Sequence, residues 1–221
     1  MPLAGKGMLL TSMDIDRADE ADFNRWYDRE HLEERVAIQG FIEARRYVAR
    51  VGSPKYLCLY STETIDVLDS PAYRARLANP TDWSKRSMAQ FKNMIRAVAR
   101  ITISRGQGRG AVLGIVRLRP QTGQDEALRA QLNKRLDPAT LDGVISMHLI
   151  ESDARLSGPT AEIPSASTGS GDWYVLIDGI NASAVSSMLA RFTGAAVPAM
   201  QVSSGIYDLM WDLANCDIPR A

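Results

Sequence analysis

The chain has 221 residues, and its 26 lysines and arginines balance its 26 aspartates and glutamates, so the formal net charge is zero. Without a basic excess, nothing in the composition favours a nucleic-acid or anionic-membrane partner. The hydrophobic content of 45% is ordinary for a globular protein, and the apolar run before Asp14 is too short for a signal peptide or a membrane span. We therefore expect a soluble, cytoplasmic protein of one large domain or two small ones.

The residue types that usually hold metals or nucleotides are sparse. Cys58 and Cys216 belong to no CxxC or Cys/His pattern, which argues against a zinc site and favours reduced thiols. The glycine-rich segment 105–110 is followed by a strand pattern, whereas a phosphate-binding loop requires a helix at that point. We expect neither a metal nor a cofactor.

The first half alternates strand and helix patterns. Residues 7–15 are strand-like, and a helix over residues 21–38 follows and ends before Gly40. Two strands then flank the turn at residues 52–54. The remaining elements are a helix ending before Asn79-Pro80, a short helix and a strand, at residues 62–78, 82–92 and 94–104. The order β-α-β-β-α-β is that of a ferredoxin-like unit.

Beyond residue 110 the same order repeats. Strands are predicted at residues 111–119, 143–152, 173–178 and 206–213, and helices at 123–136 and 182–192. Residues 40–45 align with 143–148, and 56–59 with 174–177, which indicates a tandem duplication. We predict a first repeat at 1–105, a linker at 106–110 and a second repeat at 111–221. The small-residue loop at 157–171 is either a lid or an exposed tip.

The predicted helix at 21–38 has an unusual buried stripe. Helical spacing puts Phe23, Tyr27, His31 and Glu34 on one face, with Trp26 beside them. A helix that only covers a sheet would place aliphatic residues there. Buried polar groups need hydrogen-bond partners or a wet cavity, so the stripe indicates a site beneath this helix.

The stretches WYDREH and GFIEARRY, within residues 20–50, resemble the EthD-like proteins of the dimeric α/β-barrel superfamily. The resemblance implies an α+β fold in which two ferredoxin-like sheets form a barrel. It also implies a small-molecule site under the first helix. The superfamily includes cofactor-free isomerases and monooxygenases as well as haem-binding groups, so the fold alone does not specify the reaction.

Four residues are candidates for catalysis. His31 has the side chain best suited to acid/base work near neutral pH, although it could instead lock the helix by bonding a carboxylate. Tyr27 could donate to a substrate oxygen or orient the imidazole. Arg45 and its counterpart in the repeat, His148, could bind a substrate oxygen or be satisfied core groups. The candidate substrate-binding residues are Trp26, Glu34, Tyr47, Tyr60 and Tyr207.

The leading hypothesis is a cofactor-independent lyase, dehydratase or isomerase that acts on a small hydrophobic or aromatic intermediate, with His31 as general acid/base. Three alternatives stay open: a haem protein with His31 or His148 as axial ligand, a non-catalytic ligand-binding or stress-response module, and a cofactor-free monooxygenase. A homodimer is compatible with each of them.

Overall fold

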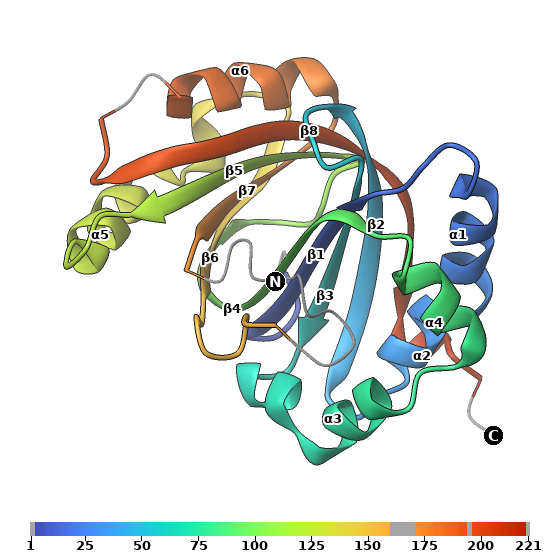
Figure 1. Cartoon of the computed structure of the whole chain (residues 1–221). Helices are drawn as coiled ribbons and strands as arrows, with labels where there is room; N and C mark the ends of the chain where they lie inside the picture. Colours follow the sequence, from blue (N-terminus) through green and yellow to red (C-terminus); the bar gives the residue numbers. More distant parts are fainter. Residues whose placement is uncertain (1–2, 160–170, 194–195, 220–221) are drawn as a thin grey trace.

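The computed structural model describes residues 3–159, 171–193 and 196–219, and its centre is a closed barrel of eight antiparallel strands (Figure 1). The predicted α+β barrel class is confirmed. The strands are β1 Gly7–Asp14, β2 Phe41–Val51, β3 Tyr56–Thr62, β4 Lys92–Gly106, β5 Val112–Pro120, β6 Val144–Ser152, β7 Trp173–Gly179 and β8 Ala199–Ala214.

Strand order around the barrel is β1-β3-β2-β8-β5-β7-β6-β4. The strands of the first half are therefore neighbours in the order β4-β1-β3-β2, and those of the second half follow in the order β8-β5-β7-β6. Pairing of β2 with β8 and of β4 with β6 joins the two halves. Closure leaves no free sheet edge, which removes the usual site of strand addition.

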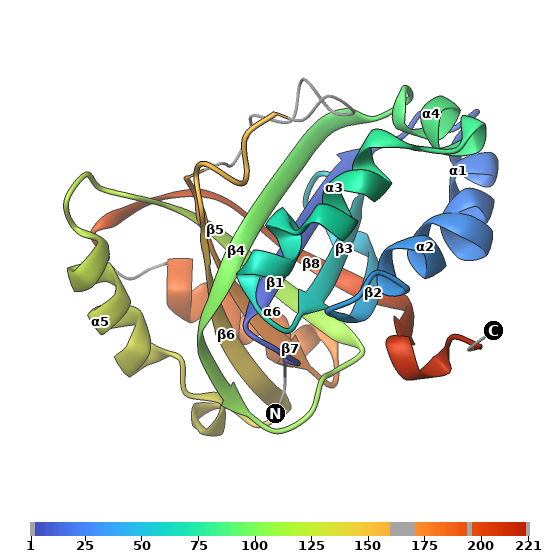
Figure 2. The ribbon, with the colours of Figure 1, turned by 90° about the horizontal axis from the view of Figure 1, so that it is seen from below.

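The helices lie outside the barrel, in two groups on different sides (Figures 1 and 2). None of those described is long and apolar enough to cross a bilayer. The helical segments are α1 Glu20–Trp26, a π turn Tyr27–His31, α2 Leu32–Val36, a 3₁₀ turn Ile65–Asp69, α3 Pro71–Ala78, α4 Asp82–Met88, α5 Asp125–Arg135, a 3₁₀ turn Pro138–Thr140, α6 Ala182–Thr193 and a 3₁₀ turn Asn215–Asp217.

Strand alternation divides the apolar residues into three cores. Along β1, Met8 and Leu10 face the barrel interior, while Leu9 and Met13 face the helices of the first half. A third core lies between the second half's strands and α5 and α6. The barrel interior is thus largely filled, and the room for a site lies between a helix layer and the outer face of the strands.

The second helix and the last strand of the chain differ from the predicted elements. The helix expected at 62–78 is interrupted, because Pro71 begins a new helix whose first turn is capped by the Ser70 hydroxyl, which accepts from the Tyr73 amide. The last strand is twice the predicted length, since β8 spans both halves. Residues 160–170 of the loop predicted as a lid or tip lie outside the described residues.

A buried ion pair connects the two halves inside the barrel. Arg45 on β2 donates to the Asp178 carboxylate on β7 at 3.2 Å and to the Gly110 carbonyl at 3.0 Å. Both charged side chains are almost fully buried. Removal of one partner of such a pair leaves an uncompensated charge in a medium of low dielectric.

Asp178→Asn should therefore lower the free energy of unfolding by about 3–5 kcal/mol in urea denaturation. Asp208→Asn is the matched control, because Asp208 pairs with Arg50 on the exposed outer surface and its loss should cost less than about 1 kcal/mol. Equal losses for the two variants would contradict the assignment of Arg45–Asp178 as a buried link.

Candidate active site

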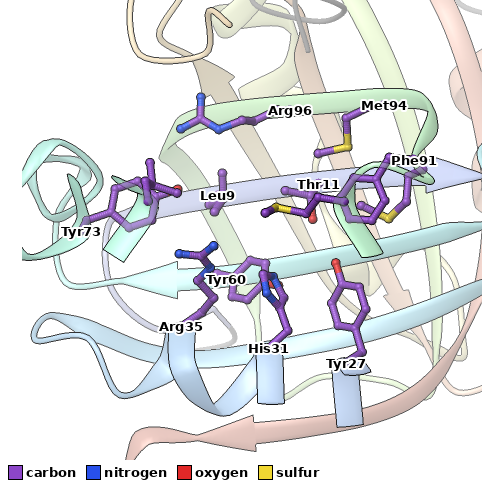
Figure 3. A pocket seen from close by; sticks show the side chains of 13 residues that line it. Leu9, Thr11, Tyr27, His31, Arg35, Tyr60, Tyr73, Phe91, Met94 and Arg96 are labelled. Atoms are coloured by element: carbon purple, nitrogen blue, oxygen red, sulfur yellow. The ribbon is translucent and has the colours of Figure 1, made fainter. Parts of the chain in front are cut away.

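The helix that carries the predicted site residues contains one wide turn. At Tyr27–His31 the chain forms a π turn, in which the Leu32 amide donates to the Tyr27 carbonyl five residues earlier. This turn holds one extra residue. The side chains of Tyr27, His31 and Arg35 therefore lie in a row on the helix face that is directed toward the barrel (Figure 3).

The Glu30 carboxylate anchors this turn to α4. It accepts hydrogen bonds from the Trp26 indole at 3.2 Å, the Ser84 hydroxyl at 3.2 Å and the Thr81 hydroxyl at 2.6 Å. Thr81 also caps α4, since its hydroxyl accepts from the Ser84 amide. The residue before His31 is thereby fixed from two elements, which restricts the direction of the imidazole.

Beneath the helix lies a cavity of about 40 Å³, room for a few water molecules. It lies between the helix layer and the outer face of β1, β3 and β4, and all its walls come from the first half (Figure 3). Three of its walls are methionine side chains, which adjust readily to a ligand. The lining residues are Leu9, Thr11, Met13, Tyr27, His31, Arg35, Tyr60, Tyr73, Leu77, Met88, Phe91, Met94 and Arg96.

Four buried polar atoms at this cavity have no hydrogen-bond partner in the part of the chain that the structure describes. They are Thr11 Oγ1, His31 Nδ1, Arg35 Nη1 and Tyr60 Oη. Buried polar groups are nearly always paired, and each unpaired one costs about 1–3 kcal/mol. Four of them around one small cavity indicate a place for a polar ligand or for water.

The imidazole of His31 is held in its neutral form. Burial lowers its pKa well below the usual value, and the positive charges of Arg35 and Arg46 lower it further. The ring packs at 4.2 Å from the Trp26 ring and at 5.0 Å from the Tyr27 ring, measured between centroids. Burial raises the pKa of Tyr27 and of Tyr60, so both phenols keep their protons. The site therefore offers one neutral base beside two phenol donors.

Of the predicted site residues, the structure places Tyr27, His31 and Tyr60 together at the cavity. Trp26 does not line it but packs behind the imidazole. The placement of Glu34 on the same stripe is wrong. The extra residue of the π turn rotates its side chain away from the cavity, and its carboxylate oxygen Oε1 lies 3.4 Å from Nη1 of Arg76. Arg35 occupies the position expected for Glu34.

The predicted assistance from Arg45 or His148 is also wrong in its geometry, because both face the barrel interior. His148 Nδ1 lies 3.0 Å from the Ser104 hydroxyl, and Nε2 lies 3.1 Å from the Ser146 hydroxyl. Alternation along β2 points Arg45 inward, opposite to the helices.

Tyr47 and Tyr207 lie in the barrel interior as well. The Arg45 guanidinium lies 5.3 Å from the centroid of the Tyr47 ring, and the Tyr207 hydroxyl donates to the Pro54 carbonyl. Neither tyrosine lines the cavity at His31. The predicted substrate-binding set is thus divided between two sides of the barrel wall.

Sequence reasoning missed Thr11, Arg35 and Arg96. Thr11 lies between the outward-facing Leu9 and Met13 in the alternation of β1, and Arg96 follows Met94 on the same face of β4. The signal that could have identified Thr11 and Arg96 was a polar residue among apolar residues on the helix-facing side of a strand. Nothing in the sequence predicted the π turn that places Arg35.

Haem does not fit this arrangement. His148 is fully buried, and both of its ring nitrogens have hydroxyl partners. His31 lines a cavity of about 40 Å³, and admitting a macrocycle would require the helix layer to separate from β1, β3 and β4. The His31 ring also packs directly against Trp26 and Tyr27, which leaves no space for haem beside it.

The neutral state of His31 predicts a pH-dependent stability. Below pH 6.5 the unfolded chain protonates this imidazole while the folded chain does not, so the wild-type protein should lose up to about 1.4 kcal/mol per pH unit until the lowered folded pKa is reached. His31→Gln lacks this component. Urea denaturation between pH 7.5 and 5 should show the variant losing less stability than the wild type. Parallel pH curves would contradict the burial of a neutral imidazole.

No protein-family model matches the chain, and no curated protein matches it. Solved structures of similar fold include an anthrone oxidase-like protein, with a TM-score of 0.62 and 10% identity over 98% of this chain and 96% of the other. A monooxygenase-like protein from Lactobacillus acidophilus has a TM-score of 0.54 and 10% identity over 96% and 94%.

A haem-binding protein from Thermus thermophilus has a TM-score of 0.50 and 10% identity over 93% of this chain and 91% of its own. At such identities the likeness concerns the fold alone. The chain therefore has the closed-barrel fold of the dimeric α/β-barrel proteins.

Proposed function

We propose that this protein is a cofactor-independent enzyme that moves a proton on a small hydrophobic or aromatic molecule, with His31 as the general acid/base. The single observation that carries this proposal is the set of four unpartnered polar atoms around one cavity with apolar and aromatic walls. They combine one neutral base with several donors, which is the set needed for proton transfer next to a carbonyl group.

In the proposed step an imidazole nitrogen of His31 takes a proton from a carbon beside a carbonyl. The electron pair of the broken C–H bond moves to the carbonyl oxygen and forms an enolate. Tyr60, Thr11 and Arg35 present donors that can stabilise this oxygen, because their buried Oη, Oγ1 and Nη1 atoms are unpartnered among the described residues. Return of the proton to another carbon isomerises the molecule, and loss of a neighbouring group makes the reaction a lyase or dehydratase step.

The lowered pKa of His31 suits this chemistry in one respect. The free imidazole stays unprotonated in mildly acidic solution, so the base is available without a prior deprotonation. As negative charge develops on the substrate, it offsets the positive potential of Arg35, which is one cause of the lowered pKa. The imidazole therefore becomes more basic as the proton arrives.

We also infer that residues 1–105 and 111–221 are two copies of an EthD-like ferredoxin-like unit connected by residues 106–110. The equivalent strand orders β4-β1-β3-β2 and β8-β5-β7-β6 support this inference, as does the position of each half's helices on the outer face. Catalytic side chains belong to the first copy in this proposal. Pairing of two whole chains stays a prediction.

A second candidate function is a cofactor-free monooxygenase, favoured by the fold likeness to the anthrone oxidase-like and monooxygenase-like proteins. The same deprotonated carbon would give its electrons to dioxygen. A CH₂ group would become a carbonyl, and the second oxygen atom would leave as water. Oxygen consumption distinguishes the two candidates, because the acid/base reaction needs none.

The test is deuterium uptake from D₂O at the acidic carbon of 2-tetralone, a small aromatic ketone, followed by NMR. The wild-type protein should accelerate the exchange, and His31→Gln should slow it by about 10²–10⁴-fold, the usual contribution of a positioned base. Glu33→Gln, on the exposed side of the same helix, should match the wild type. Equal rates for wild type and His31→Gln would refute the proposed role.

A further inference from the structure

Among the residues that the structure describes, two of the buried arginines lack a carboxylate partner. Five arginines are buried, and three of them pair with aspartates: Arg45 with Asp178, Arg46 with Asp28 and Arg117 with Asp172. The other two are Arg35 and Arg96, and within the described residues neither has a carboxylate oxygen within 4 Å. Both line the cavity at His31. The two guanidinium groups therefore give this cavity an uncompensated positive potential. Burying a charge without a partner is costly, which favours an anionic ligand here.

The two guanidinium groups approach the cavity from different elements. Figure 3 shows Arg35 on α2 and Arg96 on β4 at opposite walls, with Leu9 between them. They lie toward the end of the cavity marked by Tyr73, while Phe91 and Met94 lie at the other end. His31 and Thr11 occupy the middle. The cavity therefore has a cationic end, a central base and an apolar end.

The second half of the chain fixes Arg96 in this position. The Arg96 guanidinium donates through Nη1 to the Leu156 carbonyl at 2.6 Å, just beyond β6. This segment is itself attached to β4, because the Asp153 amide donates to the Val98 carbonyl and the Ser157 hydroxyl bonds both backbone groups of Val98. A carbonyl partner orients the guanidinium but leaves its charge uncompensated.

Among the described residues, no carboxylate side chain lines the cavity, and apart from the two arginines its lining residues are neutral. From this charge pattern we propose that the site binds a small aromatic carboxylate, with the acid group held by Arg35 and Arg96 and the ring directed past His31 toward Phe91 and Met94. Binding requires the methionine side chains that line the cavity to move aside and enlarge it. The proposal deepens, and rests on, the proposed function at His31. Guanidinium groups match the planar geometry of a carboxylate, and the flat ring suits the aromatic and thioether walls.

The anchored acid group also sets which atom can react. A carboxylate held at the Tyr73 end places the adjoining carbon atoms beside the central imidazole, and the apolar end receives the remainder of the molecule. A neutral analogue loses this anchor and the charge complementarity together. Discrimination between an acid and its amide is therefore the property that this arrangement predicts most directly.

Calorimetric titration with benzoate and with benzamide, which has nearly the same shape but no charge, tests the proposal. The wild-type protein should bind benzoate at least about 10-fold more tightly than benzamide, since a hydrogen bond to a charged group contributes about that much. Arg35→Gln and Arg96→Gln should each remove most of this preference while leaving benzamide binding unchanged. Arg100→Gln, at an exposed position of the same strand β4, is the matched control and should retain it.

Thermal unfolding without ligand separates binding from structural damage. Loss of an uncompensated buried charge should leave Arg35→Gln at least as stable as the wild type, so reduced benzoate affinity in a stable variant reports on the site. Absence of benzoate binding, equal binding of the two probes, or a preference that survives both substitutions would overturn the proposal. His31→Gln should still prefer benzoate. Retained preference with no His31-dependent chemistry would refute the proposed function and leave this inference intact.

Discussion

One extra residue in a helical turn determines which side chains reach the cavity. The π turn at Tyr27–His31 lets Tyr27, His31 and Arg35 succeed one another on a single face, whereas a regular helix would have brought Glu34 toward the cavity. A carboxylate there would have neutralised Arg35 and bonded the imidazole. Because the turn is tethered through Glu30 to α4, the helix keeps a less common geometry at the point where its side chains meet the cavity.

Barrel closure accounts for the location of this cavity. Two four-stranded sheets face each other, and their inner faces are occupied by apolar side chains and by a polar cluster centred on Arg45, Asp178 and His148. In the first half the remaining room lies between helix and strand, in the cavity that His31 lines. Charge distinguishes the two environments: Arg45 and Arg117 in the barrel interior pair with aspartates, whereas within the described residues the two arginines at the cavity do not.

The order of elements and the stripe with Tyr27 and His31 could be predicted from the sequence because alternation and helical spacing are local properties. Alternation also shows which residues share a face of a strand, but not which face looks inward. For this reason the sequence suggests Arg45 and His148 as partners of His31, whereas both face the barrel interior. Arg96 acquires its role through a contact with Leu156, sixty residues away, which no local pattern encodes. The π turn depends on the hydrogen bonds from Thr81 and Ser84 to Glu30, and no local sequence pattern predicts it.

The protonation state of His31, which burial and the neighbouring arginine keep neutral, is directly measurable because the chain has only two histidines. Nitrogen NMR of ¹⁵N-histidine-labelled protein, with His31→Gln to assign the signals, reports the protonation of each ring as the pH is lowered. We expect the His31 nitrogens to keep the chemical shifts of a neutral ring well below pH 6. Titration of that ring near pH 6.5, as for an imidazole in free solution, would contradict it.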